Sequence, residues 1–133
     1  MPLYLLDSSV CIPVLRGKAD VRKPLPLTQC CLSTIVEAEL RTGARKSANP
    51  SAKLSQLDIF LAQLRIVDFD SKAASAYAAI RSTLEKIGQS IGPVDLFIAA
   101  HAISIDATLL TENYDEFRRV PGLTVKRWFS AKP

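Results

Sequence analysis

The chain has 133 residues, of which 48% are hydrophobic and 23% charged, and its net charge is +4. This length holds one domain with a sizeable core but not two, and the hydrophobic content excludes a disordered chain. The basic excess permits a polyanionic partner, although a solvated surface is the more frequent explanation of scattered basic residues.

Cysteine and histidine are scarce. The sequence has three cysteines, two of them adjacent (Cys30 and Cys31), no Cys-x-x-Cys spacing and a single histidine. A zinc site is therefore excluded, and buried, reduced thiols in a cytoplasmic protein are expected. Asp7 interrupts the first apolar run after a few residues, so we expect no signal peptide. No apolar run approaches the length of a membrane span, so we expect no membrane-spanning segment either.

Short apolar runs alternate with segments of helical periodicity. In chain order we expect a strand at 4–6, a helix at 10–15, a strand at 30–33, a helix at 34–46, a helix whose leucines are 54, 57, 61 and 64, a strand at 66–69, a helix at 71–87, a helix at 93–105, a strand at 108–110, a short helix at 115–119 and a strand at 123–125. This alternation predicts an α/β fold with a mostly parallel central sheet, which binds ligands at the carboxyl ends of its strands.

Capping residues predict where two of the helices begin. Ser8 or Ser9 is expected to cap the first helix. Thr34 and Glu37 have the spacing of a capping box at the start of the 34–46 helix.

Three acidic residues are expected at the carboxyl edge of the sheet. Asp7 directly follows the first strand, where helix capping is an equally good explanation. Glu39 falls within the apolar stripe of its helix at about 100° per residue, whereas Glu37 falls outside it and is expected to be solvated. A salt bridge is the alternative for Glu39. Asp95 lies in the first turn of a nearly all-apolar helix, where the helix dipole also favours an acid.

The segment after the 108–110 strand supplies a fourth polar position, from Asn113 or Glu116, although capping explains these residues equally well. Carboxylates crowded at one edge repel and raise one another's pKa, and a hard divalent cation removes that penalty. Oxygen ligands alone suit Mg²⁺ or Mn²⁺. Such a site can activate water and stabilise charge on a phosphate during in-line hydrolysis.

Four segments make the chain resemble the PIN-domain family, and specifically the VapC-type toxins of type II toxin–antitoxin systems. In order along the chain they are LLDSSVCI (Leu5–Ile12), STIVEAELRTGARKS (Ser33–Ser47), IGPVDLFIAAHA (Ile91–Ala102) and LLTENYDEFRRVPGL (Leu109–Leu123). The resemblance spans nearly the whole chain. It implies a single PIN domain over residues 1–133 and a three-layer α/β/α sandwich.

This resemblance also implies an activity. Such proteins are Mg²⁺-dependent endoribonucleases, in which Mn²⁺ can substitute, that cut tRNA, rRNA or mRNA and arrest translation; we expect tRNA as the substrate, cut to leave 5′-phosphate and 3′-hydroxyl ends. They are usually homodimers. A cognate VapB-type antitoxin inhibits them within a hetero-oligomer, by placing its C-terminal segment in the active-site groove.

By motif, Asp7, Glu39 and Asp95 correspond to the first three acids of the family and are the implied metal ligands. The fourth position is open: Asn113 stands where many relatives carry an acid, and Glu116 is a nearby acid that some relatives use. A residue without charge at position 113 would weaken a second metal site.

Other implied roles are supporting ones. Ser9 and Thr111 would orient the site, and His101, two turns along the helix from Asp95, is expected to be a packed core or interface residue. Basic residues that would contact the RNA backbone are Arg16, Lys18, Arg41 and Arg45.

Rival functions are weighed on the same motifs. A haloacid dehalogenase-type phosphatase needs a second aspartate two residues after Asp7, where this chain has Ser9. A response-regulator receiver needs an acidic pair near the first strand, and this chain lacks that pair. The alternative that stays open is a non-catalytic PIN module that binds RNA or a partner, and Asn113 keeps it open.

Overall fold

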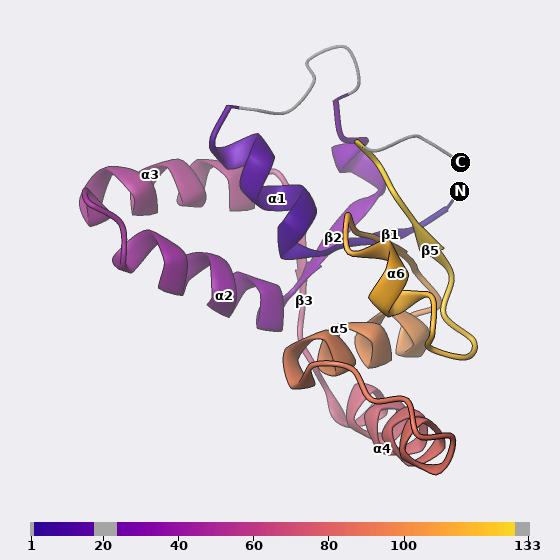
Figure 1. The fold of residues 1–133 in the computed structure, drawn as a ribbon. Helices are drawn as coiled ribbons and strands as arrows, with labels where there is room; N and C mark the ends of the chain where they lie inside the picture. The colour runs from indigo at the N-terminus through magenta and orange to yellow at the C-terminus, as the bar shows by residue number, and fades with distance from the viewer. Residues whose placement is uncertain (1, 18–23, 130–133) are drawn as a thin grey trace.

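The computed structural model describes residues 2–17 and 24–129. Its centre is a sheet in which every neighbouring pair of strands is parallel, in the order β3-β2-β1-β4-β5 (Figure 1). The strands are β1 (Tyr4–Leu6), β2 (Cys30–Ser33), β3 (Arg65–Val67), β4 (Thr108–Leu110) and β5 (Val125–Lys126). Because β1 lies in the middle of this order, the residue that follows it is at the centre of the carboxyl edge.

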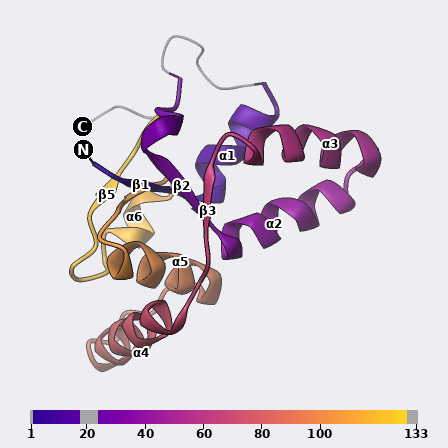
Figure 2. The same ribbon diagram turned by 180° about the vertical axis from the view of Figure 1, so that it is seen from behind.

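Helices cover both faces of the sheet. They are α1 (Ser8–Leu15), α2 (Thr34–Arg45), α3 (Pro50–Leu61), α4 (Ser71–Lys86), α5 (Pro93–Ser104) and α6 (Tyr114–Phe117), with a 3₁₀ turn η1 (Leu27–Gln29) before β2. The helices α1, α2 and α3 lie on one side, and α4 and α5 pack together on the other (Figures 1 and 2). The expected three-layer α/β/α sandwich is confirmed. In the described part of the chain, none of these helices has the length and apolar character needed to span a bilayer.

Two strand predictions are shifted by local hydrogen bonds. The strand expected at 66–69 ends at Val67, because the Phe69 N–H donates to the Thr34 side chain at 3.3 Å instead of to a strand. The strand expected at 123–125 is found at Val125–Lys126, because the Leu123 N–H is held in a turn by the Val120 carbonyl at 3.3 Å. Both strands lie at the edges of the sheet, where tertiary contacts decide how far pairing extends.

The predicted capping box of α2 is wrong. Ser33 is the N-cap, and its Oγ accepts a backbone N–H from the first turn at 3.0 Å. Thr34 is thereby free to bind Phe69, and Glu37 accepts a hydrogen bond from Arg41 at 2.9 Å rather than folding back to the cap. Serine in extended backbone at this strand–helix junction satisfies the Ile35 N–H, whereas the expected capping box would have used Thr34 to satisfy the N–H of Glu37.

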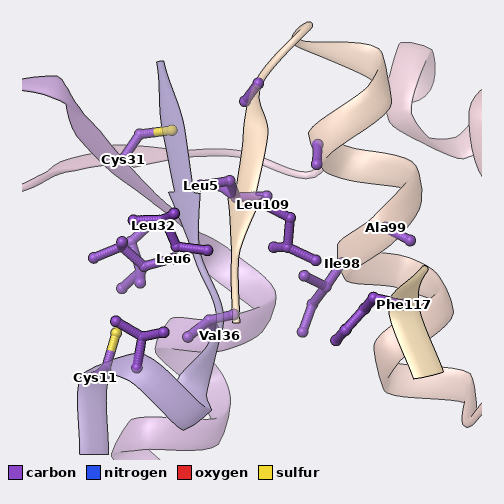
Figure 3. Packing of buried hydrophobic residues seen from close by; sticks show 14 of the residues in the cluster. Leu5, Leu6, Cys11, Cys31, Leu32, Val36, Ile98, Ala99, Leu109 and Phe117 are labelled. Atoms are coloured by element: carbon purple, nitrogen blue, oxygen red, sulfur yellow. The ribbon is translucent and has the colours of Figure 1, made fainter. Parts of the chain in front are cut away.

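The core lies between the sheet and both helix layers. Figure 3 shows Leu109 of β4 packed toward Ile98 of α5, with Phe117 of α6 beside Ile98. On the other side of the strands, Leu6 and Leu32 lie together. Each large apolar side chain fully removed from water contributes about 1.5–3 kcal/mol, so this cluster is what fixes α5 against β4.

His101 is a core residue, as expected. It is 1% exposed, its Nδ1 lies 2.8 Å from the Ser33 Oγ, and its ring meets Phe69 edge to face at a centroid distance of 5.4 Å. Burial lowers the pKa of His101. Since Ser33 caps α2 and His101 belongs to α5, this contact ties the helix that carries Glu39 to the helix that carries Asp95.

Replacing Asp106 by glycine should stabilise the protein. Asp106 follows α5 with φ of 55°, a left-handed conformation that costs L-residues about 1 kcal/mol, and its side chain is exposed. We expect Asp106→Gly to raise the free energy of unfolding in urea by about 0.5–1 kcal/mol. Asp106→Ala removes the same charge but keeps a Cβ, so it should not stabilise. Equal gains from both variants would show that charge, not backbone strain, was relieved.

Candidate active site

Asp7 is held by two hydroxyl groups. It is 4% exposed and occupies the N-cap position of α1, but its side chain makes no cap hydrogen bond. Its Oδ2 instead accepts hydrogen bonds from Ser9 Oγ at 2.8 Å and Thr111 Oγ1 at 2.7 Å. The prediction that Ser8 or Ser9 caps α1 is therefore wrong, and the carboxylate of Asp7 is turned to the carboxyl edge of the sheet.

The loop after β4 sets the direction of these hydroxyls. The Glu112 N–H donates to Ser9 Oγ and the Asn113 N–H donates to Thr111 Oγ1, both at 2.9 Å. A hydroxyl has one proton, so an oxygen that already accepts from an amide is free to donate that proton to Asp7. The residues predicted to orient the site thus contact the first acid directly.

Asp95 and Glu116 form a second carboxyl pair, bridged by Asn113. The Asn113 Nδ2 lies 3.4 Å from Asp95 Oδ2 and 3.0 Å from Glu116 Oε2. The Gly92 N–H also donates to Glu116 Oε1, at 2.9 Å. Sequence reasoning left Asn113 and Glu116 as alternatives, and the structure places both near Asp95. Glu116 supplies a second carboxylate, and Asn113 supplies the side-chain amide between the two carboxyl groups.

This arrangement separates the pKa values of the pair. Partial burial and the negative charges of Glu116 and Asp7 raise the pKa of Asp95 to about 7. The hydrogen bonds from the Gly92 amide and from Asn113 lower the pKa of Glu116. Near neutral pH, Asp95 therefore exchanges between its protonated and ionised forms. Sequence reasoning missed Gly92, because a backbone amide leaves no signal in residue type.

Glu39 reaches the site from α2, although not as expected. The residue is exposed, whereas Glu37 is the half-buried acid of this helix, so the prediction that Glu39 faces inward is wrong. Its carboxyl is nevertheless close enough to Asp7 that partial burial and the Asp7 charge raise the pKa of Glu39. The side of α2 that carries Glu39 does face the protein, but at Glu39 it borders an open cleft instead of the core.

That cleft opens between α1, α2 and α3 and has a volume of about 310 Å³. Its apolar walls include Ile12, Leu15, Leu40 and Leu57. Glu39, Arg16 and Lys53 are the charged groups that line it. The cleft therefore adjoins the other acids at Glu39, and its walls combine apolar side chains with two basic ones.

The predicted RNA-backbone residues separate into different environments. Arg16 lines the cleft and Arg45 is exposed, whereas Arg41 is bound by Glu37 and by Asp58 at 3.3 Å. Lys18 lies outside the described residues. Sequence reasoning did not single out Lys53 for this role. Its spacing of four residues from Leu57 places both on one face of α3 and was the signal available.

The donors at this edge fit a hard divalent cation. Asp7, Glu39, Asp95 and Glu116 all offer carboxylate oxygens. The charges of the other three help to raise the pKa of Asp95, and the charge of Asp7 helps to raise that of Glu39. Within residues 2–17 and 24–129, no group of three or more acidic, histidine or cysteine side chains is already drawn together to hold an ion directly. A cation that keeps several water ligands, as Mg²⁺ does, suits such an open set.

The relatives of the chain share nearly its whole length. The profile of the PIN domain matches residues 4–123. The chain is 40% identical over 131 residues to a protein named ribonuclease VapC2 from Rickettsia felis, with 95% of this chain and 98% of that protein covered. It is 34% identical over 128 residues to a protein named tRNA(fMet)-specific endonuclease VapC from Salmonella typhimurium, with 94% and 97% covered.

A solved structure agrees with the same assignment. The crystal structure of VapBC2 from Rickettsia felis bound to a promoter DNA fragment superposes with a TM-score of 0.88 and 38% identity, over 95% of this chain and 98% of that one. The family match over residues 4–123 includes the four segments that carry Asp7, Glu39, Asp95 and Glu116. The chain thus belongs to the PIN-domain family, as an endoribonuclease of the VapC type.

Proposed function

We propose that this protein is a Mg²⁺-dependent toxin that cuts tRNA and so inhibits translation. The observation that carries the proposal is that Asp7, Glu39 and Glu116, from three other chain segments, lie near enough to Asp95 for their charges to raise its pKa, and that Glu39 also lines an open cleft. The tRNA(fMet)-specific name of the Salmonella typhimurium relative supports tRNA as the substrate. Mn²⁺ has the same ligand preference and would substitute.

Each residue has a part in this proposal. Asp7 and Asp95 would hold the cation directly, and Glu39 and Glu116 would reach it directly or through water. When bound, the cation would neutralise charge on the scissile phosphate and lower the pKa of a water nucleophile. Ser9 and Thr111 keep Asp7 in one orientation, because each donates its only hydroxyl proton to Oδ2. Arg16, Arg45 and Lys53 would contact phosphates along the bound strand.

A VapB-type antitoxin is the proposed regulatory partner. The solved neighbour is a VapBC complex, and the cleft has the chemistry for a peptide. Apolar side chains of the antitoxin's C-terminal segment would pack on Ile12, Leu15 and Leu57, with a basic side chain directed to Glu39. We further propose a homodimer of the toxin within this hetero-oligomer. The described cysteines are free thiols, which accords with action in the cytoplasm.

The affinity for Mn²⁺ should depend on pH. A cation binds the ionised carboxylate, and the pKa of Asp95 is raised to about 7, so protons compete with the metal below that value. We expect the Mn²⁺ affinity to fall about tenfold between pH 8 and pH 6. Titration followed by the electron paramagnetic resonance of free Mn²⁺ would measure it. The same affinity at both pH values would contradict the role given to Asp95.

Cleavage of defined RNA by the purified, antitoxin-free protein tests the proposed function. Total tRNA and a panel of structured RNAs would be incubated with Mg²⁺, with Mn²⁺ or with EDTA. We expect discrete tRNA fragments with either metal and none with EDTA. RNA binding without cleavage, and without saturable Mn²⁺ binding, would favour the non-catalytic PIN module. Cleavage that persists in EDTA would refute the metal mechanism.

A further inference from the structure

Glu112 is an acid of the loop at the carboxyl edge, and its carboxylate accepts hydrogen bonds from residues that follow β5. It sits between Thr111 and Asn113, and its own N–H donates to Ser9 Oγ at 2.9 Å. Its side chain is bound elsewhere: Oε2 accepts the Trp128 N–H at 3.0 Å and the Phe129 N–H at 3.1 Å. One carboxylate oxygen therefore joins the loop that orients Asp7 to the segment that follows β5.

That segment contacts the active-site loop at further points. The guanidinium of Arg127 lies 4.8 Å from the centroid of the Tyr114 ring, and its Nη2 is 3.8 Å from Asp115. Strand β5, which precedes this segment, is joined to the same loop, because the Thr111 N–H donates to the Lys126 carbonyl at 3.1 Å. The α6 helix, which carries Glu116, is only one turn long, so its position depends on such contacts.

The end of the segment is fixed to the body of the protein. The side chains of Trp128 and Phe129 are partly buried and pack against the hydrophobic core. Glu112 thus connects a packed segment to residues 111–113, whose amides and side chains bind Ser9, Asp95 and Glu116. A shift of this loop would move the hydroxyl that holds Asp7 and the amide that bridges the other two acids.

We propose that Glu112 is a positioning residue, which sets the geometry of the metal site by tying the 127–129 segment to the 111–113 loop. It acts through Ser9, Thr111 and Asn113 and is not itself a metal ligand. This inference rests on the proposed function, because the geometry it protects is that of the cation site.

The chemistry of the tie dictates which substitutions disturb it. Both amides donate to the same oxygen, so glutamine, with its carbonyl oxygen in that place, can accept both hydrogen bonds without the charge. Alanine leaves both amides without this acceptor. A positioning role therefore predicts a large effect of Glu112→Ala and substantial rescue by Glu112→Gln, whereas a metal ligand would be impaired by both.

The test uses the full-length protein and Mn²⁺. Residues that orient metal ligands change metal affinity by about 10–100-fold when replaced. We expect Glu112→Ala to weaken Mn²⁺ binding about tenfold and to lower kcat about tenfold, with KM for tRNA within about twofold of wild type. Glu112→Gln should stay within about threefold in both quantities. Glu85→Ala, which removes an exposed acid paired with Arg81 on α4, is the matched control.

A second readout needs no metal. Trp128 is the only tryptophan in the sequence, so its fluorescence reports on the tied segment alone. In metal-free Glu112→Ala the emission should shift to longer wavelength, and chymotrypsin should cut faster at Trp128 or Phe129, while Glu112→Gln resembles wild type. Circular dichroism would show whether the alanine variant folds. If it does not, Glu112→Asp, which shortens the tie by one methylene, should show smaller changes of the same sign.

Two results would overturn the inference. The first is a folded Glu112→Ala protein that binds Mn²⁺ as tightly as wild type. Even if its tryptophan emission shifts, the hydrogen bonds of Glu112 would then hold the 127–129 segment without affecting the metal site. Equal losses in the alanine and glutamine variants would identify Glu112 as a ligand instead. If the wild-type protein binds no Mn²⁺, the proposed function fails and this inference fails with it. That result is distinct from the first two, because the Glu85→Ala control would then bind no Mn²⁺ either.

Discussion

Asp95→Asn should abolish metal-dependent RNA cleavage and, at pH 8, make the metal-free protein more stable. Under the proposed function Asp95 helps to hold a cation that stabilises the transition state by several kcal/mol, so the activity loss should be about 1000-fold or more. The gain in stability follows from the raised pKa of Asp95. Activity and stability therefore change in opposite directions at one residue, which no purely structural role for Asp95 predicts.

The effect of Asp95 on stability depends on pH. The pKa of Asp95 has its ordinary value of 3.8 in the unfolded chain and is about 7 in the folded protein. Folding is therefore favoured while the group is protonated, below pH 3.8, and this contribution is lost as the pH rises to about 7. At pH 8 the ionised Asp95 lies beside Glu116 and Asp7 at a net cost. Asparagine removes this cost, although it also forgoes the small gain from the helix dipole.

Urea unfolding in EDTA at pH 8 would measure this effect. Asp95 is only half-buried and solvent screens its charge, so we expect a gain of about 1–2 kcal/mol rather than the full value of the pKa difference. Asp115→Asn, the same change at a neighbouring acid whose side chain is 79% exposed, should leave stability nearly unchanged. A variant that loses both stability and activity would mean that Asp95 serves folding.

Of the substitutions considered for this protein, Phe117→Ala should lower the free energy of unfolding most. Phe117 is 0% exposed and packs beside Ile98, at the end of the one-turn helix α6 (Figure 3). Truncation of a buried phenylalanine to alanine removes its transfer free energy and leaves a cavity, at a cost of about 3–5 kcal/mol. Since small domains are stable by about 5–15 kcal/mol, the variant should remain only marginally folded.

Thermal and urea unfolding would measure this loss, with Phe117→Leu as the control of smaller volume change. We expect the leucine variant to lose less than half as much stability and to keep its Mn²⁺ affinity. Glu116 is the neighbour of Phe117 on α6, so the alanine variant should also bind Mn²⁺ more weakly at temperatures where it is folded. A loss below about 1 kcal/mol for Phe117→Ala would mean that the side chains around Phe117 move to fill the cavity at little cost.

These two residues show how the site and the core depend on each other. A cluster of carboxylates at one sheet edge costs stability in the absence of a cation, because each charge is near another of the same sign. The buried side chains of α5, α6 and the sheet keep the cluster assembled despite that cost. For a VapC-type endoribonuclease, the metal-free protein is therefore held in a shape that its own charges oppose, and cation binding should stabilise it.

The sequence by itself determined the parts of this protein that follow from periodicity and chain order. Apolar runs of strand length placed β1, β2 and β4, and a helix that is apolar nearly all round predicted the buried α5 with Asp95 in its first turn. Strands that alternate with helices made the sheet parallel, which brought Asp7 and Asp95 to one edge. These features follow from the pattern of apolar residues along the chain, because burial of apolar surface favours the same strands and helices with many different neighbouring side chains.

Tertiary structure decided what depends on partners distant in sequence. Ser33 rather than Thr34 caps α2, because Thr34 binds Phe69. Glu112 and Glu116 lie four residues apart, yet one joins Asp95 and the other is drawn to the backbone of Trp128 and Phe129. A hydrogen bond depends on where its partner lies, and no local pattern carries that position. The order of strands and helices therefore brought the acids to one edge of the sheet, whereas hydrogen bonds from distant backbone amides hold Glu116 at Gly92 and Glu112 at Trp128 and Phe129.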